Sequence, residues 1–333
     1  MRRPLWAASY NFIELDLGFN MGVWDINKSG QVVGRYGPGT AFLYDGTIHD
    51  LGTLPGGTSS TAYGINEGGQ VAGDSAVSIN SHHALFYDGT MHDLGTFGGP
   101  SSTAWDINKD KQVVGEADTT SPWVTHAFFY DGVMHDLGTL GGSSSSAKGI
   151  NNDGQIVGWA ATSSGSHAFL WDGTMHDLGT LGGNQSWVAR INDSAQVVGK
   201  SETADNHEHA FLYDGTMHDL GTLGGNTSEA YGVNGNGEVV GRALTADGAY
   251  HAFLYDGTMH DLNTFIDPAS GWTLTEARVI NDSGMIVGYG FHNGTDYRAF
   301  ILVPTPEPST LVLLATALAS LPFLAWRRRN RSC

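Results

Sequence analysis

The chain has 333 residues, enough for one large all-β domain or two ordinary domains. It carries 34 acidic and only 16 basic residues, a formal charge of −18, so its surface repels the phosphates of nucleic acids and anionic lipids. The single cysteine, Cys333, excludes an intrachain disulfide.

Residues 1–9 form a short lead-in, and residues 10–303 are built from one repeated unit. The clearest marker of the repeat is an asparagine that follows Ile or Val and recurs seven times at spacings of 39 to 47 residues. These asparagines are Asn27, Asn66, Asn108, Asn151, Asn192, Asn234 and Asn281. A period near 42 residues indicates a repeat architecture.

Each copy of the repeat contains four short runs with β-strand character. Examples are "AYGIN" at 62–66, "QVVG" at 112–115, "HAFLYDG" at 209–215 and "MHDLGTL" at 217–223. An Asp-Gly pair between the third and fourth runs is typical of a tight hairpin, and Asn-x-x-Gly between the first and second runs suits a slightly longer one. Four antiparallel strands in about 42 residues predict one blade of a β-propeller.

The number of runs predicts how the propeller closes. The first three runs occur seven times, but the fourth occurs only six times. The chain opens with "FIELDLG" at 12–18, which we align with the fourth run through Asp16, Leu17 and Gly18, so that Leu15 replaces the repeating histidine. We therefore predict an all-β, seven-bladed propeller whose last blade is completed by an N-terminal strand, which removes the open edge. An open solenoid or two smaller propellers are alternatives, but neither explains the additional strand.

His-Ala-Phe triplets begin the third run at His126, His167, His209 and His251. They resemble the HAF-type repeat family, and the resemblance covers residues 10–303. The resemblance implies an exported bacterial protein, and the family has no catalytic residues that could be assigned to positions of this chain. Thr40 in the first copy and Arg298 in the last stand in place of this histidine.

The fourth run carries a His-Asp pair in six copies. Neighbouring residues of a strand point to opposite faces, so the two side chains of a pair cannot converge on one ligand. Equivalent positions on the outer strands of different blades also lie far apart. We interpret the pairs as structural, forming hydrogen bonds within or between blades. They are His49-Asp50, His92-Asp93, His135-Asp136, His176-Asp177, His218-Asp219 and His260-Asp261.

The copies differ most in the loops after the second and fourth runs, which lie on one face of an antiparallel propeller; we call this the variable face. The innermost strand adds a variable position two residues before the repeated Ile. The candidate ligand-binding residues on this face are Trp24, Tyr63, Trp105, Trp123, Lys148, Trp187, Arg190, Tyr231, Trp272 and Arg278. Aromatic rings beside carboxylates such as Asp106, Asp118 and Glu202 suit sugar binding, although such rings also fill the space between blades.

The C-terminal segment, residues 304–333, has three parts in order. Pro306-Glu307-Pro308 is followed by an apolar stretch at 309–326, long enough for a membrane helix, and then by Arg327, Arg328 and Arg329. This arrangement resembles a PEP-CTERM sorting signal. The resemblance implies export, processing by exosortase machinery, and anchoring in the membrane at least transiently. It also implies a signal peptide. Residues 1–16 contain Arg2 and Arg3 but lack the apolar stretch of about seven or more residues that a signal peptide needs, so we interpret Met1 as a truncated or misassigned start.

The sequence shows no EF-hand loop, zinc spacing, nucleophile elbow or phosphate-binding loop, so we expect no metal, no cofactor and no catalysis. Our leading hypothesis is an exported, non-catalytic surface or matrix protein that binds an extracellular polysaccharide or a surface protein through the variable face. One alternative is a propeller lyase or glycosidase that uses Asp25, Asp106 or Arg190 near the axis. Another is a purely structural matrix component.

Overall fold

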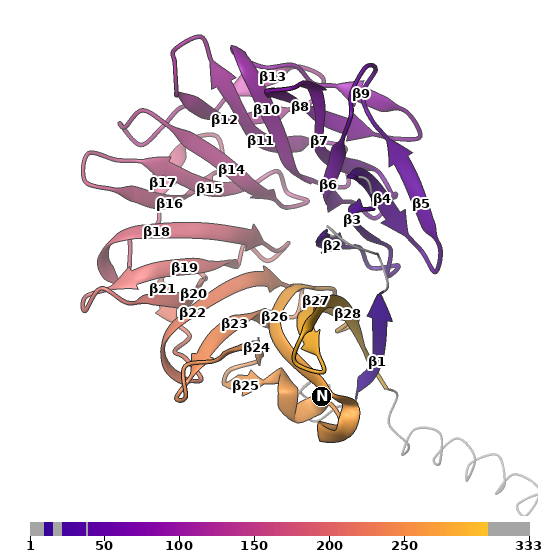
Figure 1. Cartoon of the computed structure of the whole chain (residues 1–333). Helices are drawn as coiled ribbons and strands as arrows, with labels where there is room; N and C mark the ends of the chain where they lie inside the picture. Colours follow the sequence, from indigo (N-terminus) through magenta and orange to yellow (C-terminus); the bar gives the residue numbers. More distant parts are fainter. Residues whose placement is uncertain (1–9, 16–21, 38, 306–333) are drawn as a thin grey trace, which may run out of the picture.

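The computed structural model describes residues 10–15, 22–37 and 39–305. They form seven four-stranded antiparallel sheets arranged as blades around an axis (Figure 1), which confirms the predicted seven-bladed propeller. The strands, from the innermost to the outermost of each blade, are as follows: blade 1, β2 (Gly22–Ile26), β3 (Val32–Tyr36), β4 (Thr40–Tyr44), β5 (Ile48–Gly52); blade 2, β6 (Ser60–Ile65), β7 (Val71–Ser78), β8 (Ser81–Tyr87), β9 (Met91–Asp93); blade 3, β10 (Gly98–Ile107), β11 (Val113–Thr119), β12 (Thr125–Tyr130), β13 (Met134–Asp136); blade 4, β14 (Ser145–Ile150), β15 (Ile156–Ala161), β16 (Ser166–Trp171), β17 (Met175–Asp177); blade 5, β18 (Gly182–Ile191), β19 (Val197–Thr203), β20 (Glu208–Tyr213), β21 (Met217–Asp219); blade 6, β22 (Gly224–Val233), β23 (Val239–Thr245), β24 (Tyr250–Tyr255), β25 (Met259–Asp261); blade 7, β26 (Trp272–Ile280), β27 (Ile286–His292), β28 (Asp296–Pro304), β1 (Tyr10–Leu15).

The glycine that ends each Val-Val-Gly run explains how tightly the inner strands pack. At Gly115 an added Cβ would lie 2.0 Å from the carbonyl oxygen of Thr103 on the innermost strand and 2.7 Å from the ring of Phe128. Only a residue without a side chain fits there, and the fully buried phenylalanine of the third strand covers it. The repeated Gly and Phe are therefore one packing unit.

The hydrophobic core lies between blades rather than inside one of them. One cluster joins Val157 and Ala168 of blade 4 to Val197 and Phe211 of blade 5. Similar clusters occur at the other junctions, so each blade is stabilised mainly by its neighbours, as in other repeat folds.

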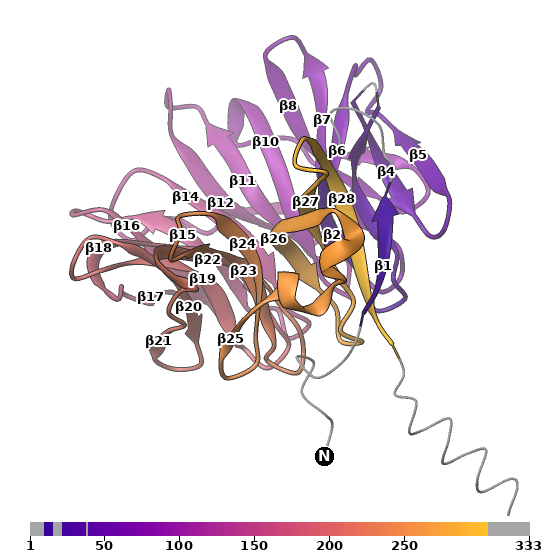
Figure 2. The ribbon, with the colours of Figure 1, turned by 60° about the horizontal axis from the view of Figure 1, so that its bottom comes forward.

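Strand β1 completes blade 7 by pairing antiparallel with β28, as predicted (Figures 1 and 2). The predicted register was wrong by two residues. Glu14 lies opposite Phe300, as Asp136 lies opposite Phe128 in blade 3, so Ile13 rather than Leu15 takes the place of the histidine. Leu15 is instead buried opposite Ala299. A slip of two residues keeps every side chain on its own face, so alternation of apolar and polar residues cannot detect it.

Two 3-10 helices, η2 (Leu262–Phe265) and η3 (Pro268–Ser270), connect blades 6 and 7. Within the described part of the chain, no helix is long and apolar enough to span a membrane. The predicted membrane helix at 309–326, the Pro306-Glu307-Pro308 triplet and the arginines Arg327 to Arg329 lie outside the described residues.

Candidate functional site

A closed ring of hydrogen bonds surrounds the axis at the end where the first and second strands of each blade are joined; we call this end the asparagine face. The Nδ2 of each repeated asparagine donates to the backbone oxygen of the asparagine in the next blade. The bonds measure 2.8–3.3 Å and run Asn27 to Asn66, Asn108, Asn151, Asn192, Asn234, Asn281 and back to Asn27. The last bond joins blades 7 and 1, so it closes the ring between distant parts of the sequence.

The same asparagines also shape the turns. The Oδ1 of Asn108 accepts hydrogen bonds of 3.0 Å from the backbone N–H groups of Asp110 and Gln112. Sequence reasoning treated these residues as turn markers and missed the ring. A signal was present, because the asparagine is kept in all seven copies whereas Lys111 and Ala195 replace the turn glycine.

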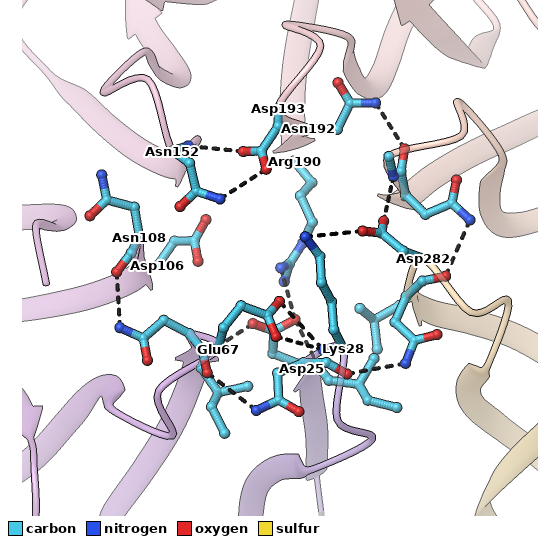
Figure 3. Close-up of a pocket in the computed structure, with 18 of the residues that line it drawn as sticks. Asp25, Lys28, Glu67, Asp106, Asn108, Asn152, Arg190, Asn192, Asp193 and Asp282 are labelled. Atoms are coloured by element: carbon cyan, nitrogen blue, oxygen red, sulfur yellow. Dashed lines mark hydrogen bonds and ion pairs between the residues drawn. The ribbon is translucent and has the colours of Figure 1, made fainter. Parts of the chain in front are cut away.

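The ring borders a cavity of about 150 Å³ on the axis (Figure 3). The residues that follow the asparagines form its rim and are linked in pairs. The Nζ of Lys28 lies 3.2 Å from Asp282, and the Nδ2 of Asn152 donates to Asp193 over 2.8 Å. The rim therefore carries both charges, and its polar groups already satisfy one another.

Three charged side chains lie deeper along the axis: Asp25 and Asp106 are buried, and Arg190 is half-buried. The Asp25 carboxylate accepts hydrogen bonds from the backbone of its own Ile26 and from Ile65 of the next blade, and the Nη1 of Arg190 binds it at 2.8 Å from across the ring (Figure 3). In the same way, the Asp106 carboxylate accepts a hydrogen bond from the backbone N–H of Ile150 in blade 4. The carboxylates thus connect neighbouring innermost strands.

Burial raises the pKa of both aspartates, and the charge of Arg190 and the backbone hydrogen bonds offset only part of this effect. Burial opposes the charged form of Arg190, but the nearby Asp25 and Asp106 outweigh it and raise the arginine pKa. Arg190 lines the cavities at both ends of the axis, so its side chain lies between them.

The opposite end of the axis opens on the variable face. A pocket of about 160 Å³ there is lined by seven of the ten predicted ligand-binding residues: Trp24, Tyr63, Trp105, Lys148, Arg190, Tyr231 and Arg278. We call this pocket the variable mouth. The ring centroids of Trp24 and Tyr63 are 5.3 Å apart, those of Tyr63 and Trp105 are 4.5 Å apart, and the Nζ of Lys148 lies 3.6 Å from the Trp105 ring centroid. These four side chains, from four consecutive blades, form a continuous arc.

The other half of the variable mouth is ionic. Arg278 lies over the ring of Tyr231 at 4.6 Å and contacts Glu276 at 3.0 Å. Glu229 accepts from Arg242 at 2.7 Å and from the hydroxyl of Tyr231 at 2.8 Å. Burial works to raise the pKa of Glu229, but the hydrogen bond from Arg242 and the charge of Lys200 outweigh it and lower that pKa.

Three predicted residues lie outside the variable mouth. Trp187 lies on β18 with the Nζ of Lys200 5.2 Å from its ring centroid. Trp272 is half-buried: it packs against Phe12 of β1, with ring centroids 4.7 Å apart, and against the hydrophobic cluster between blades 6 and 7. Trp123 is 98% exposed in the loop between β11 and β12.

The repeated histidines and aspartates have separate partners, as their alternation requires. In the six fourth strands, the Nε2 of each histidine contacts the Asp of the preceding Asp-Gly turn, at 2.9 Å between His135 and Asp131. In blades 2 to 6 the neighbouring aspartate contacts the Nδ1 of a third-strand histidine, at 2.8 Å between His126 and Asp136. Blade 7 replaces this second pair with an ion pair between Arg298 and Glu14. The described residues contain no group of three His, Cys, Asp or Glu side chains that could hold a metal ion.

The fold is similar to that of propellers in solved structures. The β-propeller domain of the Trilobed protease from Pyrococcus furiosus matches 85% of this chain and 93% of its own length, with a TM-score of 0.58 and 11% identity. A puromycin-hydrolyzing peptidase from Mycobacterium tuberculosis matches 86% of this chain with a TM-score of 0.55 and 14% identity, and TolB from Acinetobacter baumannii matches 83% with 0.49 and 11%. The chain spans only 52% of that peptidase and 63% of TolB. At 11% and 14% identity, the two matches with TM-scores above 0.5 show the fold alone.

Two family models match parts of the chain. A protein of unknown function, DUF3466, matches residues 179–305, and the PEP-CTERM protein-sorting motif matches residues 304–329. The second match confirms the predicted sorting signal, which indicates an exported, surface-associated protein and implies processing by exosortase-type machinery. The resemblance to HAF-type repeats stays a prediction. No curated protein matches the chain in sequence.

Proposed function

We propose that this exported propeller is a non-catalytic binding module that holds an extracellular polysaccharide or surface protein against its variable face. The observation that carries the proposal is the convergence of seven side chains, one from each of the seven blades, on the variable mouth. Positions that differ between otherwise similar repeats come together there, whereas the asparagine face repeats the same contacts in every blade.

The polar groups of the variable mouth support a binding role. Among the residues that the structure describes, the Nε1 of Trp105 is buried without a hydrogen-bond partner, which is rare for a buried donor. Lys148 is mostly buried beside it, and burial lowers the pKa of this lysine although Glu116 partly offsets the effect. The mouth therefore contains a buried donor whose hydrogen-bonding capacity the described residues do not fill.

A propeller lyase or glycosidase is the second candidate, since the raised pKa values of the neighbouring Asp25 and Asp106 are typical of acid-base residues. Their surroundings favour a structural role. The polar side chains on the rim of the adjoining cavity are paired with one another, such as Lys28 with Asp282. The backbone and Arg190 also occupy the oxygen atoms of Asp25.

The test uses the full chain in mild detergent, sedimented with cellulose, chitin and curdlan and titrated with soluble alginate. We expect saturable binding to at least one polymer and no release of reducing sugar or unsaturated product. Lys148→Met should weaken binding about tenfold, whereas Lys109→Met, the same change on the asparagine face, should leave it unchanged. Turnover of any polymer would favour the enzyme, and inertness towards all of them would favour a purely structural role.

A further inference from the structure

The loop between β11 and β12 holds its tryptophan in an unusual backbone conformation. Trp123 has a φ of +64°, in the left-handed region that large side chains rarely adopt, and its side chain is 98% exposed. Such a conformation costs about 1–3 kcal/mol and is found mainly at functional sites. An indole that contributes no burial to the core gives no folding benefit that would offset this strain.

Neighbouring blades show what this turn ordinarily contains. In blade 5 the backbone N–H of Thr203 donates to His207, and Asn206 occupies the left-handed position with a φ of +63°. In blade 6 Thr245 donates to Ala249, and Gly248 occupies that position with a φ of +86°. Asn and Gly are the residues that such a position favours.

Blade 3 closes the corresponding turn with a hydrogen bond of 2.9 Å from the backbone N–H of Thr119 to the oxygen of Val124, one residue later than in the other two blades. Trp123 therefore stands where turn chemistry selects Asn or Gly. A residue that breaks a local rule without gaining contacts in the fold points to a role outside the fold.

Trp123 borders a groove of about 860 Å³ at the start of β10 and the end of β11. The floor is close-packed backbone, since an added Cβ on Gly99 would lie 2.5 Å from both Asp118 and the carbonyl oxygen of Thr119. The next residue is Pro100, where blades 5 and 6 have Asn184 and Asn226.

The chemistry of the groove matches an uncharged sugar chain. Its apolar side chains are the rings of Pro100, Pro122 and Trp123, and its polar side chains are mostly hydroxyls, those of Thr119, Thr120, Ser121 and Thr125. Of the described residues that line it, Asp118 alone is ionisable, and it accepts a hydrogen bond from Thr125 over 3.2 Å. Sugar rings present C–H faces for stacking and hydroxyls for hydrogen bonding, and they need no counter-charge. Proline-rich peptides instead select grooves lined by several aromatic rings.

We propose that the Trp123 groove binds an uncharged polysaccharide segment, with a sugar ring stacked on the indole. This inference rests on the proposed binding function and adds to it a second site on the variable face and a ligand class. The groove lies outside the variable mouth, so the two sites can be tested separately.

The test is calorimetric titration of the full chain with cellohexaose, laminarihexaose and maltohexaose, and with a guluronate hexamer and decaproline as comparisons. We expect saturable binding of at least one neutral hexasaccharide and at least tenfold weaker binding of the anionic one. Trp123→Asn, which installs the residue of blade 5, should weaken binding at least tenfold without lowering the melting temperature. Ile79→Asn is the matched control, because Ile79 is 97% exposed on the turn between β7 and β8, and it should bind as the parent does.

Equal binding of the hexasaccharides by Trp123→Asn and the parent would overturn the inference. It would also be overturned if no neutral hexasaccharide bound, or if decaproline alone bound in a way that depends on Trp123. Loss of sugar binding in Lys148→Met but not in Trp123→Asn would place the site at the variable mouth, so the proposed function would stand while this inference failed. Absence of binding to every polymer and oligomer would contradict both.

Discussion

At the scale of single residues, burial controls the charge of several carboxyl groups. Asp74, on β7 of blade 2, shows this most simply, because burial raises its pKa to about 6 while His82 and the hydroxyls of Thr61 and Thr103 offset only part of the effect. The folded chain therefore holds this proton more tightly than the unfolded chain, whose Asp pKa is near 4. Stability is highest while the group is protonated and declines as the pH rises from about 4 to above 6.

Asp74→Asn removes this ionisation and should flatten the decline. We expect the variant to gain stability relative to the parent between pH 4 and pH 7, by at most ~3 kcal/mol, since each tenfold change in proton affinity corresponds to ~1.4 kcal/mol. Urea unfolding at both pH values measures the difference. A constant difference across this range would show that Asp74 titrates normally.

The ion pair between Arg190 and the buried Asp25 allows a second test at the scale of single residues. Arg190→Leu leaves the buried Asp25 carboxyl without its cation, which should raise the Asp25 pKa further and destabilise the fold by ~3–5 kcal/mol. Adding Asp25→Asn should recover part of the loss, because the amide needs no counter-charge. Equal stability of the single and double variants, measured by urea unfolding, would show that the ion pair has no structural importance.

The residue scale also shows a limit of sequence reasoning. Repetition identified Asn27 and its six equivalents, but their long-range bonds depend on the curvature that brings the same position of neighbouring blades together. The layer after the Val-Val-Gly glycine, including Asp74, Glu116 and Arg242, was missed for a related reason. Each of these side chains interacts with a residue of the next blade, namely Thr103, Lys148 and Glu276, which lies well away in sequence and is brought close only by the curvature around the axis.

At the scale of elements, four strands per repeat and closure by an N-terminal strand could be predicted, because period, turn residues and strand count agree. The register of β1 could not be predicted, because "IELDLG" repeats leucine at a spacing of two and therefore offers two equivalent alignments with the fourth run. Likewise, seven of the ten candidates for the binding face do converge, but Trp272 packs against Phe12 of β1, a contact that spans almost the whole chain.

The ion pair that joins β1 to β28 can be tested by mutation. Arg298 and Glu14 replace the His-Asp pair that blades 2 to 6 form at this position. Arg298→His alone should lose stability because imidazole fits the longer glutamate poorly. Combined with Glu14→Asp it should recover, giving a coupling of about 0.5–1 kcal/mol in a double-mutant cycle. Additive effects of the two changes would show that the pair is not equivalent to its counterparts.

At the scale of the whole molecule, the propeller is held closed at two levels, by β1 on the outside of blade 7 and by the asparagine ring on the inside. Removing residues 1–15 exposes the edge of β28 and uncovers the ring of Trp272. We expect a lower melting temperature and concentration-dependent self-association, since an unpaired edge recruits other strands. Light scattering with thermal melting checks both. An unchanged melting temperature and unchanged scattering would show that the asparagine ring closes the fold alone.

The central claim is that one face of the propeller binds ligand and the other holds the ring together. Hydrogen-deuterium exchange of the full chain, with and without a saturating neutral hexasaccharide, tests it most directly. We predict that the hexasaccharide slows the exchange of backbone amides only on the variable face, above all in the loop between β11 and β12 and at the start of β10. Protection centred on the asparagine turns, such as residues 27–31 and 108–112, would contradict the account.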